Sequence, residues 1–138
     1  MAITGECFCG SVKYRIDGEL SDARSCHCSR CRKAFSAQAS AYALVQHGEF
    51  QWLAGQHLLS EYLGEHGAGV RFCGRCGSTL VGVVNGDVHG VALGCLNGNP
   101  EVRLERHIHV GSKASWETIA EGVPQYLGDP PSEAGGLS

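Results

Sequence analysis

The chain has 138 residues, a size typical of one domain that buries a core of its own. Twenty glycines against a single methionine favour strands and tight turns over long helices, so we expect a mainly β protein. The net charge of -3 provides no general attraction to nucleic-acid phosphates or anionic lipids, and we expect neither as a partner.

The sequence has no run of roughly 18 apolar residues, the length that a membrane span needs. Its first residues form neither a basic leader nor an apolar run. We therefore expect a soluble, cytoplasmic protein without membrane partners.

Strands dominate the predicted elements of the first half. Val12, Tyr14 and Ile16 alternate with polar residues, which predicts a strand that ends at Gly18. Similar patterns predict strands at residues 40–45, 49–53 and 58–63. The polar, cysteine-rich segment 25–33 is expected to be a ligand loop outside the core, followed by one helical turn at residues 32–34.

The second half is predicted to contain a hairpin. Residues 64–69 form a glycine-rich turn, and the apolar runs 79–84 and 88–93 flank Asn85-Gly86, a strong hairpin signal. A last strand is predicted at residues 106–110. A short helix is predicted at 115–121, with Ser115 as its cap. These elements predict one domain at residues 1–128 and a flexible tail at 129–138, where prolines and glycines gather.

Seven of the eight cysteines lie in three clusters, namely Cys7 and Cys9, then Cys26, Cys28 and Cys31, then Cys73 and Cys76. Eight cysteines would also suit a disulfide framework in a secreted protein. Cysteines one or two residues apart favour a metal instead, because an ion draws several sulfurs to one point about 2.3 Å away.

The first and last cysteine pairs are predicted to share one structural zinc ion. Structural zinc is normally closed by four ligands, which Cys7, Cys9, Cys73 and Cys76 would supply if their strands lie side by side. Neighbouring glycines, Gly10, Gly74 and Gly77, would let backbone N–H groups turn toward the sulfurs. The alternative is two unrelated buried or redox-active thiol pairs.

The middle cluster offers only three sulfurs, those of Cys26, Cys28 and Cys31. A catalytic zinc typically has three protein ligands and one exchangeable position, so these cysteines are candidate catalytic as well as metal-binding residues. Three thiolates favour a soft, sulfur-based substrate. The adjacent cations, Arg30, Arg32 and Lys33, would attract an acidic thiol such as glutathione or would simply form a solvated basic loop.

Four other residues carry weaker predictions. His27 is interpreted as a spacer between two ligands instead of a fourth ligand. Cys95 is expected to be a small buried apolar side chain, with the open metal position as the alternative. His107 and His109 are predicted to share one face of a strand, in surface or supporting roles.

Four motifs in order resemble those of the glutathione-dependent formaldehyde-activating enzyme family, the Gfa-like carbon-sulfur lyases. They are residues 7–10 (CFCG), 26–33 (CHCSRCRK), 72–78 (FCGRCGS) and 107–116 (HIHVGSKASW). The resemblance implies a β-tent fold, a structural zinc on the four outer cysteines and a second zinc on Cys26, Cys28 and Cys31. It also implies the reversible joining of formaldehyde to glutathione as S-hydroxymethylglutathione.

These observations lead to a zinc-dependent carbon-sulfur lyase that acts on a small thiol adduct as the principal hypothesis. A non-catalytic, zinc-stabilised binding or chaperone-like module is the alternative, and a closed middle site without a pocket would favour it. A zinc ribbon that binds nucleic acid is disfavoured by the acidic balance of the chain.

Overall fold

The computed structural model describes residues 2–131 and has a mainly β fold, as predicted. Ten strands form two sheets, and among the described residues there is one α-helix, α1 (Ser29–Phe35). Three short 3-10 segments lie between strands, namely η1 (Gln56–Leu58), η2 (Glu65–Gly67) and η3 (Leu93–Cys95), and a fourth in the described part of the chain, η4 (Val110–Ser112), follows β10 (Arg106–Ile108). No helix in the described part of the chain is long and apolar enough to cross a membrane.

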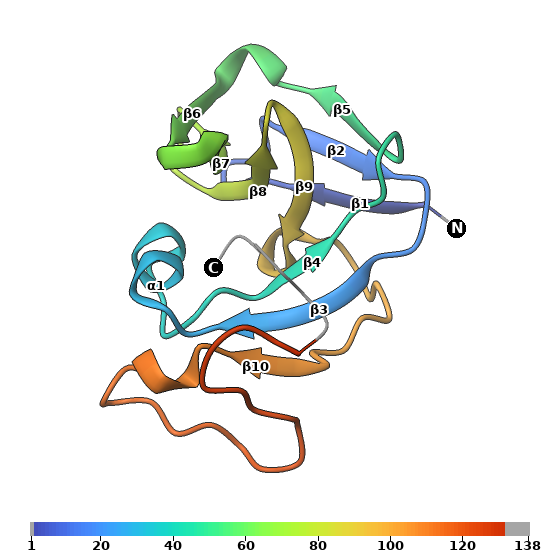
Figure 1. The fold of residues 1–138 in the computed structure, drawn as a ribbon. Coiled ribbons are helices and arrows are strands. Elements are labelled where there is room, and N and C mark those ends of the chain that lie inside the picture. Colours follow the sequence, from blue (N-terminus) through green and yellow to red (C-terminus); the bar gives the residue numbers. More distant parts are fainter. Residues whose placement is uncertain (1, 132–138) are drawn as a thin grey trace.

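The smaller sheet has three antiparallel strands in the order β1 (Ile3–Glu6), β2 (Lys13–Ile16) and β5 (Phe50–Ala54). The larger sheet has seven strands, in the order β10 (Arg106–Ile108), β3 (Ser21–Cys26), β4 (Tyr42–Leu44), β9 (Asp87–Ala92), β8 (Thr79–Val84), β7 (Ala68–Cys73) and β6 (Leu59–Leu63). Its pairs are antiparallel except β10 with β3, which run side by side at the bottom of Figure 1.

The main core lies between the two sheets. Tyr14 and Ile16 of β2 are fully buried, and they share one apolar cluster with Leu80 of β8 and Val91 of β9. The ring of Tyr14 stacks on Phe50 at 5.0 Å between centroids. The alternation that predicted β2 is therefore the burial pattern observed, with one face in the core and the other toward solvent.

The predicted hairpin is confirmed. Asn85 and Gly86 both have positive φ angles, 51° and 86°, as a two-residue turn with the right-handed twist requires. The strands on either side pair in register, with Val84 opposite Asp87. The predicted strands at 40–45, 49–53 and 58–63 correspond to β4, β5 and β6.

The prediction for residues 25–33 is wrong in two respects. Strand β3 runs into this segment and ends at Cys26, and α1 already begins at Ser29. The helix starts there because the Cys28 side chain caps it and accepts a hydrogen bond from the Cys31 N–H. Cys26 and Cys31 are both buried, so this ligand segment belongs to the core of the protein.

The predicted helix at residues 115–121 is also wrong, because this segment contains a turn and no helix. The Lys113 ammonium donates to the carbonyls of Ala114 and Glu117, which a helix would need for its own bonds. Further on, the chain is drawn to β10, where the His107 N–H donates to the Pro124 carbonyl at 2.9 Å. Tertiary pairing therefore overrides the weak local preference.

Strand β10 is shorter than predicted. It ends at Ile108, and His109 has a φ of 54°, which turns the chain out of the extended conformation into η4. His107 and His109 therefore do not lie on one face of a strand. Of the predicted tail, residues 132–138 lie outside the described residues.

Candidate functional site

The two outer cysteine pairs meet at one point. The sulfur atoms of Cys7, Cys9, Cys73 and Cys76 all lie within 4.8 Å of one another. The Cys9 sulfur is 3.6 Å from that of Cys7 and 3.9 Å from that of Cys73. Four sulfurs placed tetrahedrally at about 2.3 Å from a zinc ion would be about 3.8 Å apart, so the donor set fits zinc.

Two similar turns present these four sulfurs. Cys7 directly follows β1, and the Gly10 N–H donates to the Cys7 carbonyl at 3.0 Å. Cys73 ends β7, and the Gly77 N–H donates to its carbonyl at 2.7 Å. Both glycines have positive φ angles, 79° and 81°, which closes each turn at little steric cost. The cluster therefore links the smaller sheet to the larger one.

Hydrogen bonds to the sulfurs favour the thiolate form that metal binding requires. The Val12 N–H donates to the Cys7 sulfur at 3.3 Å. Hydrogen bonds from the side chain and backbone of Ser11 lower the pKa of Cys9 to about 6. A thiolate is the ligand form of cysteine, so this turn is prepared for a cation near neutral pH.

The second cluster contains three sulfurs, those of Cys26, Cys28 and Cys31, also within 4.8 Å of one another. Cys26 is the last residue of β3, Cys28 caps α1, and Cys31 lies in the first turn of the helix. Positions three apart in a helical turn face the same side, which brings the last two sulfurs together. No other histidine, cysteine or carboxylate of the described residues joins this cluster.

The pKa values of the three thiols are shifted in different directions. Hydrogen bonds from Cys26 and Cys31 lower the pKa of Cys28 to about 2, while the contact with Cys28 raises the pKa of Cys26. One negative charge is thus stabilised by two neighbouring thiols. The buried trio of soft donors suits a divalent cation such as zinc, whose binding would release the remaining protons.

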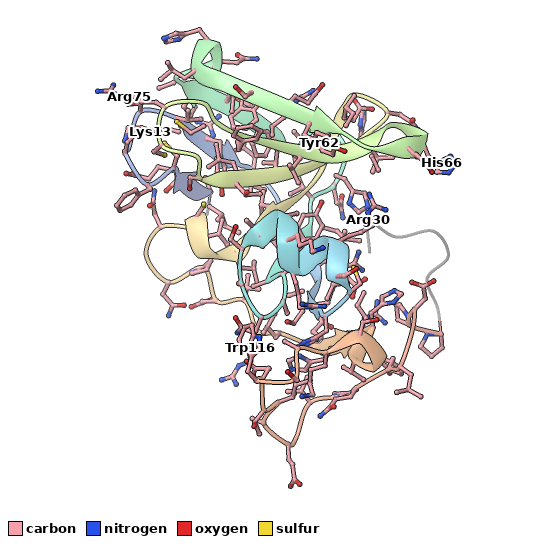
Figure 2. The ribbon with its side chains drawn as sticks, turned by 90° about the vertical axis from the view of Figure 1, so that its left-hand side faces the viewer. Lys13, Arg30, Tyr62, His66, Arg75 and Trp116 are labelled. Carbon is pink, nitrogen blue, oxygen red and sulfur yellow. The ribbon has the colours of Figure 1, made fainter. Side chains whose placement is uncertain are left out.

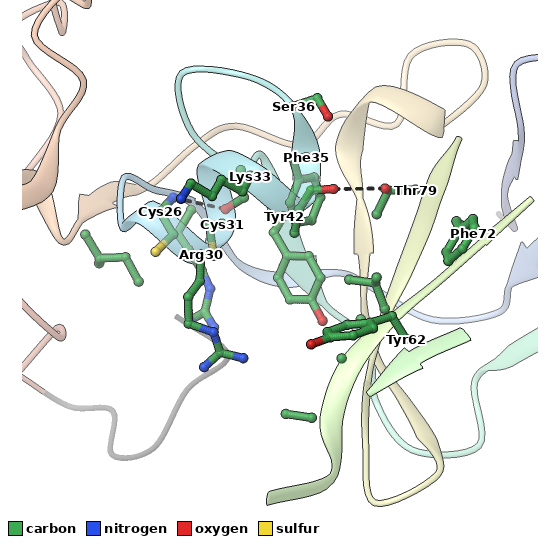
Figure 3. A pocket seen from close by; sticks show the side chains of 18 of the residues that line it. Cys26, Arg30, Cys31, Lys33, Phe35, Ser36, Tyr42, Tyr62, Phe72 and Thr79 are labelled. Carbon is green, nitrogen blue, oxygen red and sulfur yellow. Dashed lines mark hydrogen bonds between the residues drawn. The ribbon is translucent and has the colours of Figure 1, made fainter. Parts of the chain in front are cut away.

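A pocket of about 580 Å³ adjoins this cluster, and Cys26 and Cys31 contribute to its wall. Helix α1 supplies one side with Arg30 and Phe35, and Tyr62 of β6 lies on the other side (Figure 3). The Thr79 hydroxyl donates to the carbonyl of Ala34 at 3.1 Å, which attaches α1 to β8. Two of the three cysteines therefore line a space large enough for a small molecule.

His27 stays outside the metal cluster. Its Nε2 atom lies 3.0 Å from Nδ1 of His107, and its backbone N–H donates to the carbonyl of Ile108 at 2.9 Å. Burial lowers the pKa of both histidines, so the pair is neutral near pH 7. Together these bonds fasten the segment between Cys26 and Cys28 to β10.

The remaining singled-out residues, Cys95 and His109, belong neither to the three-sulfur cluster nor to the residues that line the pocket. Cys95 is half-buried, and its sulfur donates to the carbonyl of Thr79 at 3.4 Å. It packs against the main core but is less buried than expected, and it does not line the position beside the three-sulfur cluster. Nε2 of His109 pairs with Asp129 at 2.8 Å. No disulfide bond joins any of the eight cysteines in this structure.

Sequence reasoning did not identify the aromatic wall of the pocket. Phe35, Tyr42, Tyr62 and Phe72 all line it. They come from four different elements, and none lies in a pattern that distinguishes it from a core residue. Their common place in the pocket wall is visible only in the folded structure, where they come together beside the cluster of Cys26, Cys28 and Cys31.

The comparisons with known proteins agree with this site. The family model described as "Glutathione-dependent formaldehyde-activating enzyme" matches residues 2–112, so the chain belongs to this family. A crystal structure of a Rhodobacter sphaeroides protein is similar, with 29% sequence identity and a TM-score of 0.54. The similarity covers 69% of this chain and 88% of that one. No curated protein matches the chain.

Proposed function

We propose that this protein is a zinc-dependent carbon-sulfur lyase that acts on a small thiol adduct, of which glutathione with an aldehyde is one example. The observation that carries the proposal is the three-sulfur cluster of Cys26, Cys28 and Cys31 beside a pocket of about 580 Å³. Three ligands leave one coordination position for a substrate. Membership of the family supports this reaction class.

We propose a different role for each cluster, according to its number of sulfurs and its surroundings. Cys7, Cys9, Cys73 and Cys76 would hold a structural zinc, because four sulfurs complete its coordination. Cys26, Cys28 and Cys31 would hold the catalytic zinc. When bound, that ion supplies a Lewis-acid position at which a substrate thiol loses its proton near neutral pH. The proposed domain spans residues 1–128, followed by a tail at 129–138.

The proposed reaction makes or breaks one carbon-sulfur bond without a change in oxidation state. In the direction of synthesis, the thiol sulfur supplies an electron pair to the carbonyl carbon of the aldehyde. The π electrons of the carbonyl group move to its oxygen, which gains a proton as the thiol loses one. The pocket would orient the two reactants, and its apolar walls would exclude water from the new bond.

Eight free cysteines support an intracellular, reducing location, and we propose the cytoplasm. The adjoining pocket supports the lyase over the non-catalytic module, because a closed middle site without a pocket would have favoured the module.

The test is an adduct assay with Cys28→Ser. Wild-type protein, reduced and supplied with zinc, should accelerate the formation of thiol-aldehyde adducts, and Cys28→Ser should lose at least tenfold of that acceleration. Cys95→Ser is the matched control, because it removes a thiol that belongs to neither cluster. Equal acceleration by wild type and Cys28→Ser would refute the metal mechanism, and no acceleration by either would favour the non-catalytic module.

A further inference from the structure

The pocket beside the trio is mostly apolar. Side chains of Phe35, Tyr42, Tyr62 and Phe72 contribute four aromatic rings to its wall, and Val70 and Ile108 add aliphatic surface. The Tyr42 ring is fixed on both sides, because Phe35 meets it edge-on at 6.3 Å and His89 stacks on it at 5.9 Å. A ligand that fills this space removes the apolar surface of these side chains from water.

The charged groups in the same wall are all positive. Arg24, Arg30 and Lys33 line the pocket, and no aspartate or glutamate among residues 2–131 does so. Arg24 already pairs with Asp22 at 2.6 Å. Arg30 and Lys33 form no ion pair with any of the described residues, and both are exposed on α1. Figure 2 shows Arg30 on α1, and Figure 3 shows it across the pocket from Tyr62.

This combination discriminates between kinds of thiol. A carboxylate on the ligand would gain one or two charge-assisted hydrogen bonds from Arg30 and Lys33. An ammonium group would meet cations and aromatic rings but no carboxylate, so it would lose hydration without a compensating ion pair. Glutathione carries such an ammonium group in addition to its carboxylates.

We propose that the thiol bound in this pocket carries an apolar group, preferably aromatic, and an anionic group, but no ammonium group. This inference rests on the proposed function for the position of the sulfur, which would face Cys26 and Cys31. The apolar group would lie among Phe35, Tyr42 and Tyr62, and the anionic group would point toward α1.

Binding, measured apart from catalysis, tests this assignment. Isothermal titration of the reduced, zinc-supplied protein would compare 2-mercapto-3-phenylpropanoate with three probes. Its amide lacks the anion, 3-mercaptopropanoate lacks the ring, and glutathione adds the ammonium group. The phenyl carboxylate should bind at least tenfold more tightly than each of the other three.

Two variants of α1 locate the anion. Arg30→Gln and Lys33→Gln should each weaken binding of the phenyl carboxylate about threefold to tenfold and leave binding of its amide unchanged. Arg103→Gln is the matched control, because Arg103 is exposed and does not line the pocket. Tyr62→Ala should weaken both phenyl ligands equally.

The outcomes separate this inference from the proposed function. Tightest binding by glutathione, or equal binding by all four probes, would overturn the inference and leave the lyase proposal intact. Arg30-dependent binding of the phenyl carboxylate without any adduct chemistry would support the inference and refute the lyase. Absence of binding by all four probes would overturn the inference as well.

Discussion

Replacing Cys73 with serine removes one sulfur from the cluster that connects the two sheets. Cys73 is fully buried at the end of β7, and its partner Cys9 lies 64 positions earlier in the chain. A metal held by both residues closes a long loop in the folded protein. The substitution should therefore lower stability far more than an ordinary cysteine-to-serine change.

The size of the effect follows from the loop length. Cross-linking two residues 64 positions apart restricts the unfolded chain by about 4 kcal/mol in the chain-entropy account. Cys26 and Cys31 are only five positions apart, and the logarithmic dependence on loop length makes that closure worth about 2 kcal/mol less. Against a total stability of about 5–15 kcal/mol, Cys73→Ser should therefore remove between about a quarter and most of the stability.

Thermal denaturation under reducing conditions measures this difference. Cys73→Ser should lower the midpoint by roughly 10 °C or more, and Cys28→Ser should lower it by less than half as much. A strong chelator should bring wild type down to the level of Cys73→Ser. Cys95→Ser should stay within a few degrees of wild type, as a thiol outside both clusters. Equal losses for Cys73→Ser and Cys28→Ser, or a wild-type midpoint that a chelator does not move, would refute the loop argument.

Three further changes test the fold around the pocket. Leu80→Ala leaves a cavity at a fully buried position and should cost about 2–5 kcal/mol in urea unfolding, whereas a cost under 1 kcal/mol would contradict its place in the core. Gly90→Ala would put a Cβ atom 2.5 Å from the ring of Tyr42, so it should both destabilise the protein and weaken ligand binding. Burial lowers the pKa of His107 in the folded protein. The unfolded chain therefore binds a proton at His107 more readily than the folded protein does, so the stability should fall as the pH drops below about 6.5. His107→Gln should flatten this loss in urea midpoints between pH 7.5 and 5.5, and a slope equal to that of wild type would exclude His107 as its source.

Local patterns in the sequence predicted the structural features that are determined by residues close together in the chain. The alternation around Tyr14 predicted β2, and Asn85-Gly86 predicted the hairpin of β8 and β9, because both are determined within a few residues. The spacing of the cysteines predicted which sulfurs each turn presents, since such a turn is a local structure, and the four ligands of a structural zinc were the reason to combine the two outer pairs.

Contacts between distant segments were harder to predict. Strand β3 contains Asp22 and the buried Arg24, whose charges obscure the apolar pattern expected of a strand inside a sheet. Asp22 pairs with both Arg24 and Arg106, and the second pair exists only because β10 lies parallel to β3. The ion pairs that compensate these charges have no signature in any one segment of the sequence. The same holds for the pocket, because its wall combines several elements.

The positions of the two clusters are consistent with the different roles that we propose for them. The four-sulfur cluster connects a turn after β1 to the end of β7, so the packing of both sheets depends on it. The trio lies on β3 and α1, and that region is held independently by the bond between His27 and His107 and by β10. Loss of a metal from the trio should therefore leave the fold intact. Because of this separation, Cys28→Ser would be a folded protein with an altered site, and its loss of activity would report on chemistry and not on unfolding.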